Sequence, residues 1–180
     1  MNEKIILSGM GGQGIISLGY LLANAGMREK KFVSHIPSYG AEMRGGISNC
    51  FVTISDEPIY SPVVSIGDTG IFMYDPALIK FISNIKEDGL IILNQDMIKS
   101  KVNRDDIKII EVNANKKAQE MGNVKIANVI MAGIWCGYKK ILSPDSIKDQ
   151  IKETFKTKAS NLIDMNIKAF EYGFEIGSNS

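Results

Sequence analysis

The chain has 180 residues, of which 44% are hydrophobic and 23% charged, and its formal net charge is +1. This length is typical of one domain with a full hydrophobic core, so we expect residues 1–180 to form a single domain. The near-zero net charge gives no electrostatic reason to expect nucleic acid or an anionic membrane as a partner. Two cysteines and one histidine are too few for an iron–sulfur cluster, which needs about four ligands, and we expect no metal site.

The sequence also gives no sign of export or membrane insertion. Its first residues, Met1–Lys4, lead directly into an apolar segment without the pattern of a signal peptide. The longest mostly apolar stretch, 126–138, is interrupted by Asn128 and is shorter than the roughly 20 residues that cross a bilayer. We therefore expect a cytoplasmic protein.

The first 36 residues predict a strand, a glycine turn, a helix and a second strand. The apolar run 4–8 ends at a cluster of glycines, and a helical pattern follows that Gly26 would close. Residues 32–36 form the second strand. This βαβ order predicts a parallel pair of strands with a right-handed crossover.

The rest of the chain continues the alternation of strands and helices. Pro76 starts a helix, Asp88-Gly89 marks a turn, and Ser143 with Pro144 is a typical helix start. Further strands are predicted over 48–55, 70–74, 90–93 and 107–112, and further helices over 76–85, 114–121, 126–141 and 158–173. The pattern predicts an α/β protein of three layers, α/β/α and Rossmann-like, with helices on both faces of a mostly parallel sheet.

The glycine cluster fits a spacing that binds diphosphates. Gly9, Gly11 and Gly14 match G-x-G-x-x-G between a strand and a helix, where backbone N–H groups can approach phosphate oxygens. The same turn can serve only to pack the helix on the strand. An NAD site is disfavoured, because Ser34-His35 stands where a carboxylate should meet the ribose.

A second unusual loop spans 37–46 and holds Tyr39, Glu42 and Arg44 among three glycines and a proline. Arg44 could bind a phosphate or carboxylate in a bidentate manner. It could instead pair with Glu42 and fix the loop, or the loop could be an interface element with an aromatic and an arginine. The residues alone leave these three readings open.

Other candidate residues favour structural roles. No partner nucleophile identifies His35 as a base, and Cys50 and Cys136 lie in apolar surroundings typical of core thiols. We predict no catalytic residue on this chain.

At three motifs the sequence resembles the γ subunit of 2-oxoacid:ferredoxin (acceptor) oxidoreductases, the family that includes the γ domain of pyruvate:ferredoxin oxidoreductase. The motifs are Gly-Met-Gly-Gly-Gln-Gly-Ile at 9–15, Pro-Ser-Tyr-Gly-Ala-Glu-Met-Arg-Gly-Gly at 37–46, and Ile-Ser-Asp-Glu-Pro-Ile at 54–59. The resemblance covers essentially the whole chain. The form of the second motif is more similar to the 2-oxoglutarate or branched-chain 2-oxoacid (2-ketoisovalerate) branch than to the indolepyruvate branch.

The resemblance implies a multi-subunit enzyme that decarboxylates a 2-oxoacid, transfers the acyl group to coenzyme A, and passes electrons to ferredoxin or a similar acceptor. Thiamine diphosphate and the iron–sulfur clusters would belong to α, β and possibly δ subunits. The γ chain would hold neither thiamine diphosphate nor a cluster, with coenzyme A as a possible ligand. It would be inactive in isolation and would contribute to binding the diphosphate of coenzyme A, to subunit assembly, or to both.

The resemblance also suggests roles for individual residues. Gly9, Gly11, Gly12, Gln13 and Gly14 would line the diphosphate region of coenzyme A. Ser38, Tyr39 and Arg44 would face the thiamine-bearing subunits or the same ligand. Two alternatives remain: a pure assembly module without its own ligand, and a stand-alone Rossmann-like nucleotide-binding protein.

Overall fold

A six-stranded sheet forms the middle of the molecule, with strand order β2-β3-β1-β4-β5-β6. The computed structural model describes residues 1–38, 46–158 and 160–180. The strands are β1 (Asn2–Met10), β2 (Phe32–Ser38), β3 (Ile47–Ser55), β4 (Gly67–Phe72), β5 (Ile85–Asn94) and β6 (Lys108–Val112).

The sheet is parallel except at β3. Strands β1, β4, β5 and β6 pair in parallel, whereas β3 is antiparallel to both β1 and β2. The predicted parallel pairing of β1 with β2 is therefore wrong, because β3 lies between them. Only eight residues connect Ser38 to Ile47, too few for a crossover connection, so the chain must return antiparallel.

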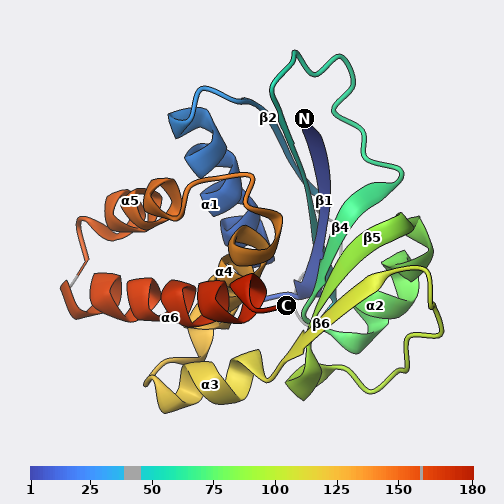
Figure 1. The fold of residues 1–180 in the computed structure, drawn as a ribbon. Coiled ribbons are helices and arrows are strands. Elements are labelled where there is room, and N and C mark those ends of the chain that lie inside the picture. Colours follow the sequence, from blue (N-terminus) through green and yellow to red (C-terminus); the bar gives the residue numbers. More distant parts are fainter. Residues whose placement is uncertain (39–45, 159) are drawn as a thin grey trace.

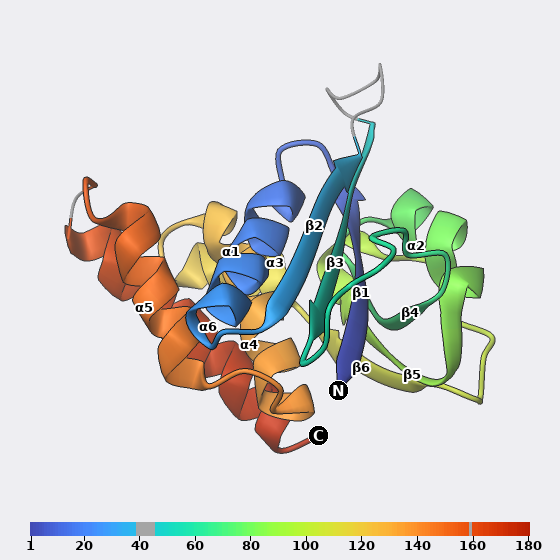
Figure 2. The same ribbon diagram turned by 90° about the horizontal axis from the view of Figure 1, so that it is seen from above.

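Helices cover both faces of the sheet, which confirms the three-layer prediction (Figures 1 and 2). One face carries five helices, and the other carries α2 with the segment that follows η2. The α-helices are α1 (Ile15–Arg28), α2 (Asp75–Phe81), α3 (Ala114–Glu120), α4 (Ala127–Lys139), α5 (Pro144–Phe155) and α6 (Ser160–Ser178), and the 3-10 turns are η1 (Ile82–Asn84), η2 (Gln95–Met97) and η3 (Val124–Ile126).

Some element boundaries differ from the sequence pattern. Helix α1 continues through Gly26 to Arg28, so Gly26 is not the residue that ends it. Asp88 and Gly89 lie inside β5, where the pairing with β4 is irregular and Asp88 adopts a φ of 55°. Helix α6 continues beyond Gly173 to Ser178.

The two faces bury separate hydrophobic clusters. The larger one joins α1 and α3–α6 to the sheet through residues such as Leu22, Ile92 and Trp135. The smaller one lies under α2 and includes Phe72, Leu78 and Ile91. Successive side chains of β5 point to opposite faces of the sheet, so Ile91 belongs to the smaller cluster and Ile92 to the larger one.

Helices α4 and α6 run parallel and touch through glycines on both sides. A Cβ added at Gly133 would lie 2.2 Å from the carbonyl oxygen of Phe170, and one at Gly173 would lie 2.0 Å from that of Ile130. Gly137 and Gly177 repeat the contact one turn further along. The two backbones are thus in direct contact over two turns, which only glycine permits.

A buried carboxylate connects this helix pair to the sheet. Glu3 on β1 is 4% exposed and pairs with Lys139, whose Nζ lies 3.0 Å from Oε2. Its Oε1 accepts from Thr69 Oγ1 at 2.7 Å and from Trp135 Nε1 at 3.4 Å. The charge is compensated and hydrogen-bonded, as a buried carboxylate requires.

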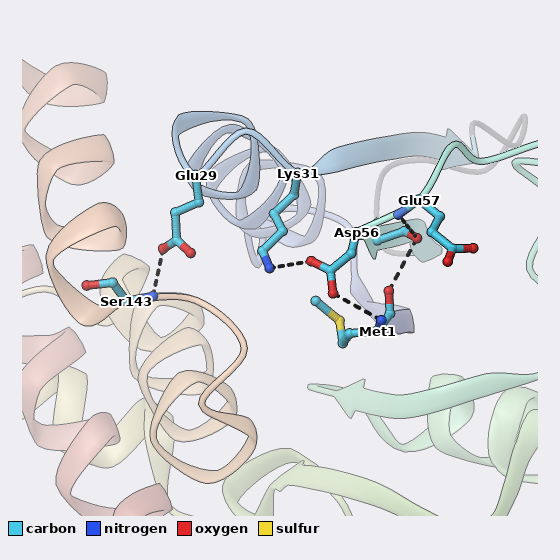
Figure 3. Close-up of polar contacts among 7 residues, drawn as sticks. Met1, Glu29, Lys31, Asp56, Glu57 and Ser143 are labelled. Atoms are coloured by element: carbon cyan, nitrogen blue, oxygen red, sulfur yellow. Dashed lines mark hydrogen bonds and ion pairs between the residues drawn. The ribbon is translucent and has the colours of Figure 1, made fainter.

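Figure 3 shows two groups of polar contacts, one at the amino end of β1 and one between the turn after α1 and the start of α5. The Asp56 carboxylate pairs with the N-terminal amino group at 3.0 Å and with Lys31 Nζ at 2.6 Å. Glu29 Oε1 accepts from the Ser143 amide at 2.7 Å, and Ser143 caps α5. Arg28 Nε also donates to Gln150 at 2.9 Å, so α5 is held beside α1.

Because of this glycine contact, we expect a glycine-to-alanine substitution in α6 to destabilise the protein, although such a substitution in a helix usually stabilises it. Glycine to alanine in a helix interior normally gains about 0.5–1 kcal/mol. We expect Gly173→Ala to lower the free energy of unfolding by about 2–3 kcal/mol instead, because its methyl group overlaps the α4 backbone. Urea unfolding of the unaltered chain and of the variant measures this change in the free energy of unfolding. The control is Gly26→Ala in α1, whose methyl would meet only side-chain atoms of Val33 and Ile54; an equal effect at both sites would contradict the argument.

Candidate functional site

The glycine loop lies between β1 and α1, where the chain order of the parallel strands reverses. From β1 the chain proceeds through α1 toward β2, and from β4 it proceeds through α2 to β5 on the other side. In open α/β sheets this switch point at the carboxyl ends of the strands is the usual ligand crevice. Gly12 (φ 99°) and Gly14 (φ 75°) both need the left-handed region, which accounts for glycine at these positions.

The side chain of Gln13 spans the switch point. Its Oε1 accepts from the Met10 amide at 2.7 Å, and its Nε2 donates to the Met73 carbonyl at 2.9 Å. Met73 directly follows β4, so the amide of Gln13 connects the ends of β1 and β4. A Cβ at Gly9 would lie 2.7 Å from this Oε1, so glycine there makes room for Gln13.

Only part of the loop remains available to a ligand. The Gly11 amide donates to the Gly46 carbonyl at 3.0 Å, and the Gln13 amide donates to Met10 at 3.1 Å. The amides of Gly12 and Gly14 have no such partner among the described residues. No side chain caps α1, and its first turn holds no acidic residue. An anion would therefore be stabilised on the Gly12–Gly14 side of the loop.

A groove of about 630 Å³ opens on that side. It lies between the N-terminal ends of α1, α4 and α6 and the C-terminal end of α5. Its lining residues are Gly12, Gly14, Ile16, Ser17, Tyr20, Leu21, Asn123, Lys125, Ile126, Asn128, Val129, Ile151, Thr154, Phe155, Leu162 and Asn166. None of these residues is acidic, and Lys125 is the one cationic side chain among them.

Two nearly buried asparagines stand out in this lining. Asn128 is 7% exposed, and its Nδ2 donates to the Gly14 carbonyl at 2.9 Å, which fixes the start of α1 against α4. Asn166 is 2% exposed, and its Nδ2 donates to Leu162 within α6 at 2.8 Å. Among the described residues, Oδ1 of neither side chain has a donor. Neither oxygen is among the fully buried side-chain atoms without a partner, so both stay accessible and can accept a hydrogen bond from a ligand in the groove.

The structure brings some of the predicted site residues together and leaves others apart. Gly12 and Gly14 line the groove. Gln13 instead connects the ends of β1 and β4, and Gly9 leaves room for its side chain. The bond from Gly11 to Gly46 places the end of the second motif beside the first. Ser38 ends β2 opposite Asn49 and is exposed. Tyr39 and Arg44 lie outside the described residues.

Sequence reasoning missed the α4 and α6 side of the groove. Lys125, Asn128 and Asn166 are far from the glycine motif in the chain and follow no known spacing. One signal was present: Asn128 interrupts the longest apolar stretch, where a polar residue needs a partner or a function.

None of the remaining chemically active side chains that the structure describes lines the groove: His35 is half-buried behind the groove residue Tyr20, and Cys50 and Cys136 are buried. Burial lowers the pKa of His35, whose Nε2 has no partner among the described residues. Burial also raises the pKa of the Cys50 and Cys136 thiols to about 12. Within the described ranges, no three His, Cys, Asp or Glu side chains cluster as metal ligands. In the same ranges, no helix is long and apolar enough to span a bilayer.

The raised thiol pKa values predict resistance to alkylation. At pH 8 a thiol with a pKa of about 12 is thiolate in roughly one molecule in ten thousand, and the thiolate is the nucleophile. We expect neither Cys50 nor Cys136 to react with iodoacetamide in the folded protein, and both to react in guanidinium. Mass spectrometry after a timed exposure measures this, and rapid labelling of the folded chain would disprove it.

Comparison with known proteins adds to this geometry. The family model described as "Pyruvate ferredoxin/flavodoxin oxidoreductase" matches residues 4–176. The chain is 33% identical over 173 residues to ketoisovalerate oxidoreductase subunit VorA of Methanothermobacter thermautotrophicus, covering 96% of this chain and 36% of that protein. It is 32% identical to 2-oxoglutarate synthase subunit KorC of Methanocaldococcus jannaschii, covering 98% of this chain and 94% of KorC. The chain thus spans about a third of the first relative and nearly all of the second.

Two solved structures share the fold. The γ subunit of a keto/oxoacid ferredoxin oxidoreductase from Geobacter sulfurreducens superposes with a TM-score of 0.84 at 26% identity, covering 99% of both chains. The 2-oxoglutarate:ferredoxin oxidoreductase from Magnetococcus marinus, solved with 2-oxoglutarate, coenzyme A and succinyl-CoA bound, gives a TM-score of 0.90 at 21% identity. It covers 99% of this chain and 31% of that one, and at this identity the likeness concerns the fold alone. The match over residues 4–176 and the similarity to KorC along nearly the whole of both chains show that this chain belongs to the pyruvate ferredoxin/flavodoxin oxidoreductase family.

Proposed function

We propose that the chain is the γ subunit of a multi-subunit 2-oxoacid:ferredoxin oxidoreductase, and that it binds the diphosphate of coenzyme A in the groove at the start of α1. The observation that carries the ligand assignment is the groove itself. It joins an uncapped helix N-terminus, a lysine and two nearly buried asparagine side chains in one cavity.

The mouth of the groove suits a diphosphate. The amides of Gly12 and Gly14 and the first turn of α1 offer N–H donors, and the helix dipole favours negative charge there. Lys125 adds a cation from the other wall. Coenzyme A carries a diphosphate and lacks the free ribose 2′,3′-diol that NAD presents to a carboxylate, so the absence of that carboxylate after β2 agrees with this ligand.

The chemistry of the reaction would then belong to other subunits. The described residues offer no group of cluster ligands and no exposed cysteine, so the iron–sulfur clusters would lie on other chains. In line with the family resemblance, we place thiamine diphosphate and the contact with ferredoxin on the α, β and possibly δ chains as well. The relatives act on ketoisovalerate and 2-oxoglutarate by name, and we propose a substrate of this class. Ser38, Tyr39 and Arg44 would face the thiamine-bearing subunits.

A pure assembly role is the second candidate, and a specific observation favours it. The segment between β3 and β4 exposes large apolar side chains: Tyr60 is 95% exposed, Val63 65% and Ile66 50%. Such side chains are typical of protein interfaces. An assembly role and a ligand role can coexist, because no residue of this segment lines the groove.

A charge placed at the groove mouth separates the two candidates. Ser17 is exposed in the first turn of α1 and lines the groove. Ser17→Glu should leave folding intact, because a carboxylate stabilises a helix N-terminus. It should raise the KM for coenzyme A by about tenfold or more in the reconstituted complex, since like charges near a protein surface repel by roughly 1–4 kcal/mol at close range. The KM for the 2-oxoacid should not change.

The matched control is Ser17→Gln. Glutamine has the same size as glutamate but no charge, so this variant should alter the KM for coenzyme A by less than about threefold. An unchanged KM in the Ser17→Glu complex, with all subunits assembled, would reject the ligand role and leave the assembly role.

A further inference from the structure

We propose that the apolar end of the groove is a base subsite that selects adenine, with Asn166 Oδ1 accepting a hydrogen bond from the exocyclic amine of the base. The inference deepens the proposed function, since coenzyme A carries an adenine. It rests on residues of α4, α5 and α6 that the glycine motif does not include.

The groove is larger than an anion requires. Its volume of about 630 Å³ lies in the range of sites that enclose a whole small molecule. The start of α1 and the η3 turn line the groove with the polar groups of Gly12, Ser17 and Lys125. The lining from α5 and α6 is mostly apolar, with Ile151, Phe155 and Leu162, and its one hydroxyl, on Thr154, already donates to the Gln150 carbonyl. A ligand that fills the groove therefore has an anionic end and a flat or bulky apolar end.

Asn166 gives the apolar end its chemical preference. The side chain is 2% exposed, its Nδ2 is committed to Leu162 at 2.8 Å, and its Oδ1 has no donor among the described residues. A purely aliphatic ligand would cover this acceptor without pairing it, which is unfavourable. A ligand with an N–H donor on a flat apolar body satisfies both the acceptor and the wall.

Adenine, the base that coenzyme A carries, fits this description. Its exocyclic amine is a donor, and asparagine is a usual partner for adenine. Hypoxanthine has a carbonyl oxygen in the same position, and two acceptors facing each other repel. The rings of Tyr20 and Phe155 also line the groove and can pack against a base.

The register of α4 and α6 supports the placement of Asn166. The glycine contacts join Gly133 to Phe170 and Gly173 to Ile130, so the two helices begin at the same end of the molecule. Extended by two turns toward the N-termini, this pairing brings Asn166 beside Ile126 and Val129, which line the groove with it. Asn166 is thus held by rigid helices.

The test compares two nucleotides that differ at one position of the base. Calorimetry on the full 180-residue chain measures the Kd of ADP and of IDP. We expect ADP to bind at least tenfold more tightly than IDP. N6,N6-dimethyl-ADP, which lacks the donor, should bind as weakly as IDP. Both comparisons use the unaltered protein, so they do not depend on how a variant folds.

A substitution then assigns the preference to Asn166. Asn166→Leu has a similar volume and no acceptor, and we expect it to bind ADP and IDP within about twofold of each other. Asn161→Leu is the control on the same helix: Asn161 is exposed and does not line the groove, so the preference should persist.

Equal binding of ADP and IDP by the unaltered chain would overturn the base subsite, and so would a preference that survives Asn166→Leu. Neither result concerns the KM for coenzyme A in the Ser17→Glu complex. Failure of the base subsite and failure of the proposed function are therefore distinguishable.

Discussion

The direct backbone contact between α4 and α6 is the constraint on which the rest of the helical layer depends. Glycines at 133, 137, 173 and 177 let the two helices approach until carbonyl oxygens of one lie where a Cβ of the other would be. The pair is then fixed to the sheet through Lys139 and Trp135, which both reach the buried Glu3. Because α4 and α6 run parallel, their N-termini meet at one edge, next to the N-terminus of α1. The groove is a consequence of that arrangement, with α5 closing it from the side.

The glycine loop shows why a motif does not determine where a ligand lies. The spacing of Gly9, Gly11 and Gly14 predicted a turn that approaches phosphates, and the turn is present. The side chain of Gln13, however, joins the ends of β1 and β4, where a dinucleotide would lie in many related folds. The two glycines whose amides remain without a backbone partner among the described residues, Gly12 and Gly14, line the groove beside α4. With the Gln13 side chain in the crevice at the switch point, the backbone of the glycine loop can bind a ligand on a different side of the sheet.

Local sequence patterns predicted most elements and few of their long-range relations. The cap at Ser143, the apolar helix after 126 and the alternation over 48–55 are local signals, and each gave the right element. The position of β3 between β1 and β2 depends on the length of a loop and on pairing across the sheet, which periodicity does not report. Gly26 was misread because a glycine that ends a helix and one that packs against Val33 are identical in sequence. For the site, the glycine motif predicted the part of the groove that Gly12 and Gly14 line. Lys125, Asn128 and Asn166 are distant from it in the sequence and come together only through the fold.

This domain makes up nearly the whole of the relative KorC and about a third of the longer relative VorA. Both hydrophobic clusters are closed within the described residues, and the helix pair, the sheet and α5 are connected by contacts inside the chain. Large apolar side chains stay exposed in the segment between β3 and β4, which is separate from both clusters. Exposed apolar side chains of this kind are typical of surfaces through which proteins associate, and such a surface is equally available to another chain or to another part of the same chain.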